Sequence, residues 1–310
     1  MLTTARAAWA RLDFAPLRAT LSAAWEVLPA ARRAPAPAPE GGLLRVEGPV
    51  SANPMSGALF VGGRRLPPPP GGERPTDWIV QTFPSRLRYP AIAPCWYGAR
   101  ADLAAILTEA LPAILALDRF PQTAGAVALV SLRLGRLDRM QELLNAGVTA
   151  PRAVKVHAWD KLISAPVAWR LETPPAPADL RAGAARLRAA FVGDRVEASG
   201  PPLALLAGGE ASPLAAAVRG AGVRVLDPDA TPLAQLVPAV AGASRVLAGG
   251  EGELAVALLA GPAAAVAEVA QGPRDPRAGL AAGAMEKSVE ILGGNQAPDW
   301  LRAAERSASH

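Results

Sequence analysis

The clearest pattern of apolar and polar residues lies in the last third of the chain. Four short apolar runs have the composition of buried strands: 203–207, 223–226, 245–248 and 265–269. Between the runs, apolar residues recur at helical spacing, and Ser212-Pro213 and Thr231-Pro232 are typical helix starts. A strand, a short loop and a helix, repeated three times, predict a parallel sheet with helices on its faces. The fourth run is expected to be the last strand, followed by a looser tail.

The first half of the chain shows the same patterns less regularly. Short strands are expected at 57–61, 78–80, 91–92, 126–130 and 153–156. Asp102 can cap a helix that runs to Leu117 and is bent by Pro112. Two further helices are expected at 131–146, where Gly147 ends the helix, and at about 179–191.

The first thirty residues combine apolar residues at helical spacing, including Trp9 and Trp25, with arginines at other positions. Such a basic amphipathic segment can lie on a membrane surface, or it can pack on its own domain or on a partner. The Ala-Pro run at 34–39 that follows is a polyproline-type spacer.

These patterns divide the chain into four parts. Residues 1–40 form the amphipathic segment and spacer, 41–172 a first α/β lobe, 173–275 a second lobe and 276–310 a tail. The predicted fold class is α/β, with two Rossmann-like lobes and an N-terminal helical and proline-rich extension.

Composition narrows the class of protein. The 310 residues are 51% hydrophobic, yet no run of apolar residues is long enough to span a membrane and no signal-peptide core is present. A single cysteine, Cys95, excludes an internal disulfide framework and a cysteine-rich zinc site. The net charge of +5 comes almost entirely from scattered arginines, which favours a GC-rich bacterial genome over a nucleic-acid-binding surface. We expect a cytoplasmic protein whose partners can include anionic small molecules or an anionic membrane surface.

Ligands of parallel α/β sheets bind at the carboxyl ends of the strands. Here that edge, called the rim below, comprises 208–210, Asp227 and 249–253. The turn Gly249-Gly250-Glu251-Gly252 could bind a phosphate through backbone N–H groups, although Glu251 and Glu253 would repel it. Asp227-Pro228-Asp229 could hold a divalent metal, but a turn between a strand and a helix needs the same residue types for its geometry. We therefore expect no metal.

Two other residues carry chemistry. His157 could act as a base or serve as a structural hydrogen bonder, and Cys95 fits a small buried residue best. The sequence has no Gly-x-Ser-x-Gly elbow, which argues against an α/β-hydrolase. It has no GxGxxG after a strand, which argues against a dinucleotide-binding oxidoreductase.

The stretch 90–269 resembles glycosyltransferase family 61, the capsular-polysaccharide-type transferases. The residues that carry the resemblance are these: Ala101-Asp102-Leu103 and Leu111-Pro112-Ala113-Ile114 in the first helix, Leu143 to Gly147, Ile163 to Val167, Gly222 to Pro228, Gln235, Ala243 to Leu247 and Glu268.

The sequence also departs from the pattern of that family. The family's Gly-x-His-Gly-Ala-Gly-Leu-x-Asn motif keeps only Leu254, with Gly250 in place of the His and Val256 in place of the Asn. Its Gly-Ala-Gly has become Glu251-Gly252-Glu253, and Ala113 replaces the Arg that follows Leu-Pro. A basic anion pocket has thus become neutral or acidic, which should weaken the binding of a diphosphate.

The resemblance implies a B-type glycosyltransferase that moves a sugar from a nucleotide-sugar donor to a glycan in bacterial polysaccharide or cell-envelope assembly. It implies an inverting mechanism, with a base from among Asp102, Glu109 and His157 and no cofactor besides the donor substrate. The donor-side candidates are Gly208, Gly209, Glu210, Gln235, Gly249, Gly250 and Glu251. The alternative is a catalytically inactive family-61-like scaffold or binding module that contacts a protein partner, or the inner membrane peripherally, through 1–30.

Overall fold

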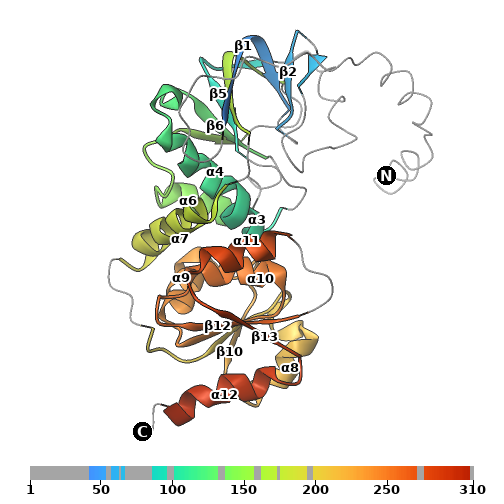
Figure 1. The fold of residues 1–310 in the computed structure, drawn as a ribbon, viewed down its shortest axis with the longest axis vertical. Coiled ribbons are helices and arrows are strands. Elements are labelled where there is room, and N and C mark those ends of the chain that lie inside the picture. Colours follow the sequence, from blue (N-terminus) through green and yellow to red (C-terminus); the bar gives the residue numbers. More distant parts are fainter. Residues whose placement is uncertain are drawn as a thin grey trace, which may run out of the picture.

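The computed structural model describes residues 42–53, 57–62, 64–66, 86–95, 101–131, 137–156, 162–172, 175–193, 198–270 and 276–307. It confirms the predicted α/β class: two β-sheets lie at a distance from each other with layers of helices between them (Figure 1). The expected N-terminal amphipathic segment, the strand at 78–80 and His157 lie outside the described residues.

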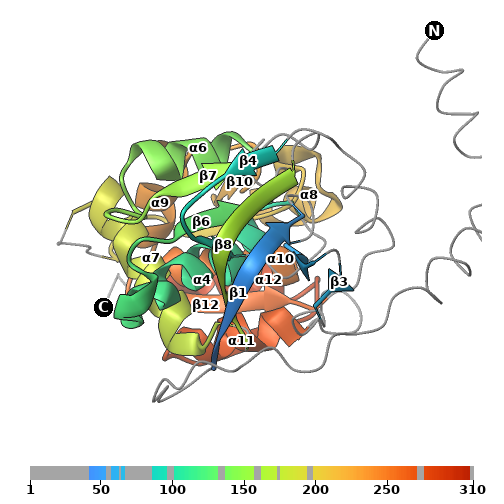
Figure 2. The ribbon, with the colours of Figure 1, turned by 90° about the horizontal axis from the view of Figure 1, so that it is seen from above.

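The first sheet is mixed, and its strand order is β3-β2-β1-β8-β5-β6-β7, with β4 also pairing with β8. The bounds are β1 Leu43–Ala52, β2 Leu59–Val61, β3 Arg64–Arg65, β4 Arg86–Arg88, β5 Ile92–Pro94, β6 Val127–Val130, β7 Val154–Val156 and β8 Leu162–Leu171. The long strands β1 and β8 pair antiparallel across the top of the molecule (Figure 2). Neither had been predicted, because charged residues and prolines interrupt their apolar pattern.

The first lobe is covered by a composite helix that Asp102 caps, as predicted. It consists of α3 (Leu103–Ala105), a π-helical turn η2 (Ile106–Ala110), α4 (Leu111–Ala116) and η3 (Leu117–Arg119), and a short turn η4 (Pro121–Thr123) follows. The Asp102 carboxylate accepts a 2.8 Å hydrogen bond from the Ala105 N–H. The wide turn ends at Ala110, two residues before Pro112, which has no N–H to continue the regular ladder. The next helix, α6 (Asp138–Asn145), begins later than expected, and Gly147 follows its end with a positive φ, in agreement with its predicted role as the residue that ends the helix.

The second sheet is parallel throughout, in the order β10-β9-β11-β12-β13. The strands are β9 Leu203–Leu205, β10 Arg224–Leu226, β11 Arg245–Ala248, β12 Ala265–Val269 and β13 Val289–Leu292. The helices are α8 Pro213–Arg219, α9 Leu233–Gly242, α10 Glu251–Val256 with η6 Ala257–Leu259, α11 Pro276–Ala284 and α12 Ala297–Ser307, and η5 is a turn at Gly209–Ala211. The expectation that 265–269 is the last strand is wrong, because residues 276–307 add α11, the edge strand β13 and α12.

Side chains on the two faces of the second sheet belong to two different hydrophobic cores. Leu203 and Leu205 of β9 join the large core on the face covered by α9, α10 and α11, whereas Ala204 belongs to a smaller core under α8 and α12 (Figure 1). The large core continues into the first lobe, and the helix α7 (Pro177–Phe191) lies between the two sheets. At Gly183 of α7, a Cβ would lie only 3.3 Å from Leu111 Cδ2, so α7 and α4 approach closely. Within the described part of the chain, no helix is long and apolar enough to cross a bilayer.

Candidate functional site

The strand order places the switch point of the second sheet between the loops that follow β9 and β11. From β9 the chain passes through α8 to β10 on one side, and from β11 it passes through α10 to β12 on the other. In open parallel sheets of this order, ligands bind where the connections diverge in this way. The Gly249 N–H donates a 2.9 Å hydrogen bond to Leu205 O, and a Cβ on Gly249 would lie 2.6 Å from Leu206 Cδ2. The structure thus brings the two predicted glycine turns together, and only glycine fits at Gly249 without a shift of its neighbours.

The carboxylate of Glu253, in the first turn of α10, is already bonded to backbone N–H groups at this switch point. Its carboxylate accepts hydrogen bonds from its own N–H and from the Ala207 N–H in the loop after β9. Burial raises the pKa of the Glu253 carboxyl and the charges of Asp229 and Asp227 raise it further, while the two hydrogen bonds lower it. The Glu253 carboxylate therefore lies at the turn where the sequence suggested that a phosphate could bind.

Asp227, at the end of β10, fixes the first glycine turn. Its Oδ2 accepts a 3.1 Å hydrogen bond from the Gly208 N–H, and its Oδ1 accepts one of 2.9 Å from the Asp229 N–H. Gly209 has a φ of +54°, and a Cβ there would lie 3.2 Å from Asp227 Cβ. These contacts support the geometric interpretation of Asp227-Pro228-Asp229. Among the described residues, no group of three or more His, Cys, Asp or Glu side chains is arranged to hold a metal ion.

Asp229 joins the second lobe to the first. Its Oδ1 accepts a 2.9 Å hydrogen bond from the N–H of Leu103, the first residue of α3. Burial raises the pKa of the Asp229 carboxyl, as do the charges of Asp102 and Asp227, whereas the Leu103 hydrogen bond and Arg139 lower it. The rim is therefore acidic, and the predicted base candidate Asp102 faces it from the first lobe.

The remaining candidates are placed as follows. Glu109 is buried at 6% exposure in the π-helical turn, seven residues beyond Asp102. Glu210 is exposed and forms an ion pair with Arg219, at 2.7 Å between Oε2 and Nη2. Gln235 is exposed in the first turn of α9, and Glu251 is the half-buried first residue of α10.

Sequence analysis did not identify two polar residues of α6 that reach the second lobe. Arg139, with a side chain only 8% exposed, donates a 2.9 Å hydrogen bond from Nη2 to Ala230 O and forms an ion pair with Glu142. The second carboxylate oxygen of Glu142 accepts a hydrogen bond from the N–H of Leu233, the first residue of α9. The sequence shows only that Arg139 and Glu142 are three residues apart and so lie on the same side of the helix.

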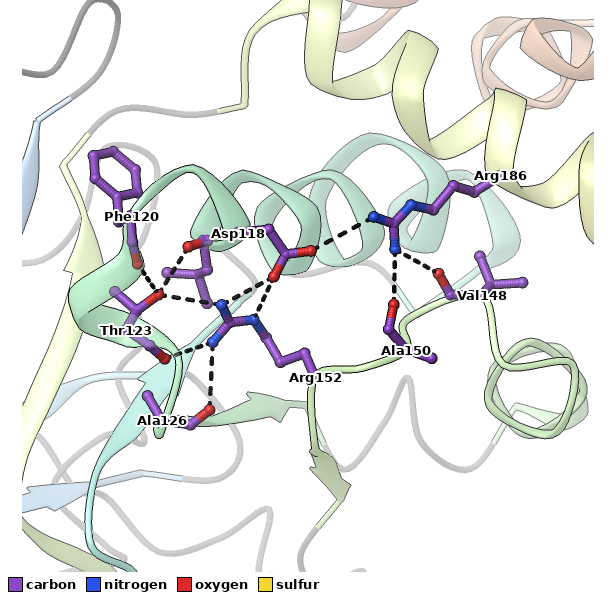
Figure 3. A network of polar contacts seen from close by, with 9 residues as sticks. Asp118, Phe120, Thr123, Ala126, Val148, Ala150, Arg152 and Arg186 are labelled. Carbon is purple, nitrogen blue, oxygen red and sulfur yellow. Dashed lines mark hydrogen bonds and ion pairs between the residues drawn. The ribbon is translucent and has the colours of Figure 1, made fainter.

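A second polar network lies inside the first lobe (Figure 3). The Arg152 Nε donates to Asp118 Oδ1 at 3.0 Å, and its Nη1 donates to Thr123 O at 2.8 Å. Arg186 reaches the other oxygen of Asp118 and donates to Ala150 O at 3.1 Å. These contacts tie the end of the composite helix to the β6–β7 region, so the network is structural. Cys95 is buried as predicted, and burial raises the pKa of its thiol to about 12.

Comparison with protein-family models gives no match for this chain, and the search of curated proteins gives none either.

Proposed function

We propose that the protein is a divergent glycosyltransferase-like protein of bacterial polysaccharide or cell-envelope assembly, with two Rossmann-like lobes in a B-type arrangement. The observation that carries the proposal is the position of the two glycine turns at the switch point of the second sheet. The glycine turns after β9 and β11 meet there, at the edge that α3 of the first lobe also reaches, since a Cβ on Gly252 would lie 3.9 Å from Ala104 Cβ. The family-61 resemblance places a nucleotide-sugar donor at the same edge.

In this proposal the donor's diphosphate lies against the loops of Gly208, Gly209, Gly249 and Gly250, and it approaches the backbone at Gly208, where a Cβ would meet nothing within 4 Å. The acceptor hydroxyl enters from the side of the first lobe, where Asp102 is the base candidate that reaches the rim. The base takes the proton as the acceptor oxygen attacks, and the diphosphate leaves with the electron pair of the broken bond. Catalysis takes place in the cytoplasm or at the inner face of the membrane, with 1–30 as the peripheral contact.

A second candidate is the inactive scaffold, and the position of Glu253 favours it. Its carboxylate already accepts the hydrogen bond of the Ala207 N–H, so a diphosphate must displace it or bind beside it. Two negative charges at close range repel each other by several kcal/mol when they are shielded from water. In this role the protein keeps the fold and contacts a partner.

Calorimetric titration of the full chain with UDP-, GDP-, CDP- and dTDP-sugars separates the two candidates. The transferase predicts micromolar binding of at least one donor and about tenfold or more tighter binding by Glu253→Gln, a gain of ~1.4 kcal/mol. Glu251→Gln, the same change two residues away, is the matched control and should give a smaller gain. No binding by either the wild type or Glu253→Gln would refute the donor site and leave the scaffold. A stable complex recovered from the native host by size exclusion would then support it.

A further inference from the structure

The loop between β10 and α9, residues 227–232, is held by two helices of the first lobe, α6 and α3. On one side the buried Arg139 of α6 donates a hydrogen bond to Ala230 O at 2.9 Å. On the other side the N–H of Leu103 in α3 donates to Asp229 Oδ1 at 2.9 Å. A loop of the second lobe thus lies between two helices of the first, with hydrogen bonds to each.

The start of α9 depends on the first lobe for its cap. The residue before the helix is Pro232, and no side-chain hydrogen bond from its own loop satisfies the first amides. Glu142 of α6 supplies the acceptor for the Leu233 N–H instead, while its other oxygen pairs with Arg139. An N–H group at a helix start needs such a partner, so α9 is completed only when the lobes are in contact.

The same loop fixes the first glycine turn through Asp227, which accepts the Gly208 N–H. A continuous chain of contacts therefore runs from Glu142 and Arg139 through Ala230 and Asp229 to Asp227 and Gly208. We propose that this loop couples α6 to the Gly208–Gly209 turn. The contact between α6 and the loop sets the conformation of the turn, and a change at α6 or at the turn alters the conformation of the other. Such coupling is reciprocal, so whatever binds at the turn also tightens or loosens the contact between the lobes. The inference does not depend on the chemistry of the ligand.

The test is amide NMR and hydrogen exchange on the full-length chain with Glu142→Gln. The Leu233 N–H and the Arg139 guanidinium donate to different oxygens of Glu142, and glutamine replaces one of these oxygens with an NH2 group that cannot accept, so one of the two contacts is lost in this geometry. We expect exchange at Leu233 and Leu103 to become at least tenfold faster, and the amide resonance of Gly208 to shift. The Ala128 amide, which is bonded to Ala153 O far from the loop, should exchange as in the wild type.

The matched control is Glu47→Gln, which removes an exposed ion pair with Arg45 on β1 and should leave these amides unchanged. Faster exchange at Leu233 alone, with Leu103 and Gly208 unaltered, would overturn the coupling. An equal acceleration at Ala128 would also overturn it, since that would indicate general destabilisation. If Glu142→Gln does not fold, Arg139→Met provides the same test, because it removes both the hydrogen bond to Ala230 O and the ion pair with Glu142.

Discussion

Replacing Asp118 with asparagine should remove about 2–3 kcal/mol from the free energy of unfolding. The side chain of Arg152 is only 4% exposed, and both its Nε and its Nη2 contact Asp118 Oδ1, at 3.0 and 2.9 Å. Breaking a buried ion pair by removing one partner costs about 3–5 kcal/mol, because it leaves an uncompensated buried charge. We take a lower figure because Asp118 is 30% exposed and Arg152 keeps its hydrogen bonds to the Thr123 backbone and hydroxyl oxygens.

The assay is urea unfolding of the wild type and Asp118→Asn, compared by midpoint and slope, because an unchanged slope identifies a true stability change. Asp299→Asn is the control: Asp299 pairs with Arg302 at 3.3 Å, and both side chains are exposed, so its loss should cost about 0–1 kcal/mol. If Asp118→Asn costs no more than this control, the buried guanidinium does not depend on its carboxylate and the reasoning fails.

Three further predictions concern the rim and the thiol. Because burial raises the pKa of the Glu253 carboxyl in the folded state, its ionisation opposes folding, so Glu253→Gln should raise the melting temperature at neutral pH. That gain should shrink as the pH falls through the raised pKa, and a gain that grows on acidification contradicts it. Gly249→Ala should cost about 1–3 kcal/mol in urea unfolding, because its Cβ would meet Leu206 Cδ2 at 2.6 Å, whereas Gly220→Ala has nothing within 4 Å and should be close to neutral. The buried Cys95, whose thiol has a pKa of about 12, should react with a thiol reagent at neutral pH only after unfolding, and fast labelling of the native chain would refute this.

The second sheet could be predicted because its inner strands are buried on both faces and read as continuous apolar runs. The strands β9 and β12 illustrate this, since almost every residue is buried. The edge strand β13 was missed because it is four residues long, carries Glu290 and is only partly covered. The antiparallel strand β1 was missed because exposed residues such as Glu47 alternate with buried ones, and a register shift between Glu47 and Val50 breaks the period.

In the candidate site, residues with partners nearby in the sequence could be predicted, whereas residues with distant partners could not. Asp102 could be predicted as a helix cap because the signal lies within four residues. The ion pair of Arg139 and Glu142 could not be assigned a role, because each contacts a residue 91 positions away along the chain. Spacing in a sequence reports on one helix or one turn, whereas these partners meet only after both lobes have folded.

The acidic residues of the rim accept hydrogen bonds from the backbone of its loops, besides making the rim negatively charged. The amides of Ala207, Gly208 and Glu253 lie on the loops that would otherwise present N–H groups to a ligand, and each donates to a carboxylate of the chain. These carboxylates give the amides a hydrogen-bond partner within the chain, so the loops hold their shape without a ligand. Asp227 and Glu253 differ in this respect. Asp227 also accepts the Asp229 N–H and so maintains the turn, whereas burial and neighbouring charges oppose the ionised form of Glu253. Removal of the Glu253 carboxylate should therefore favour anion binding at the switch point of the sheet and leave the turn in place.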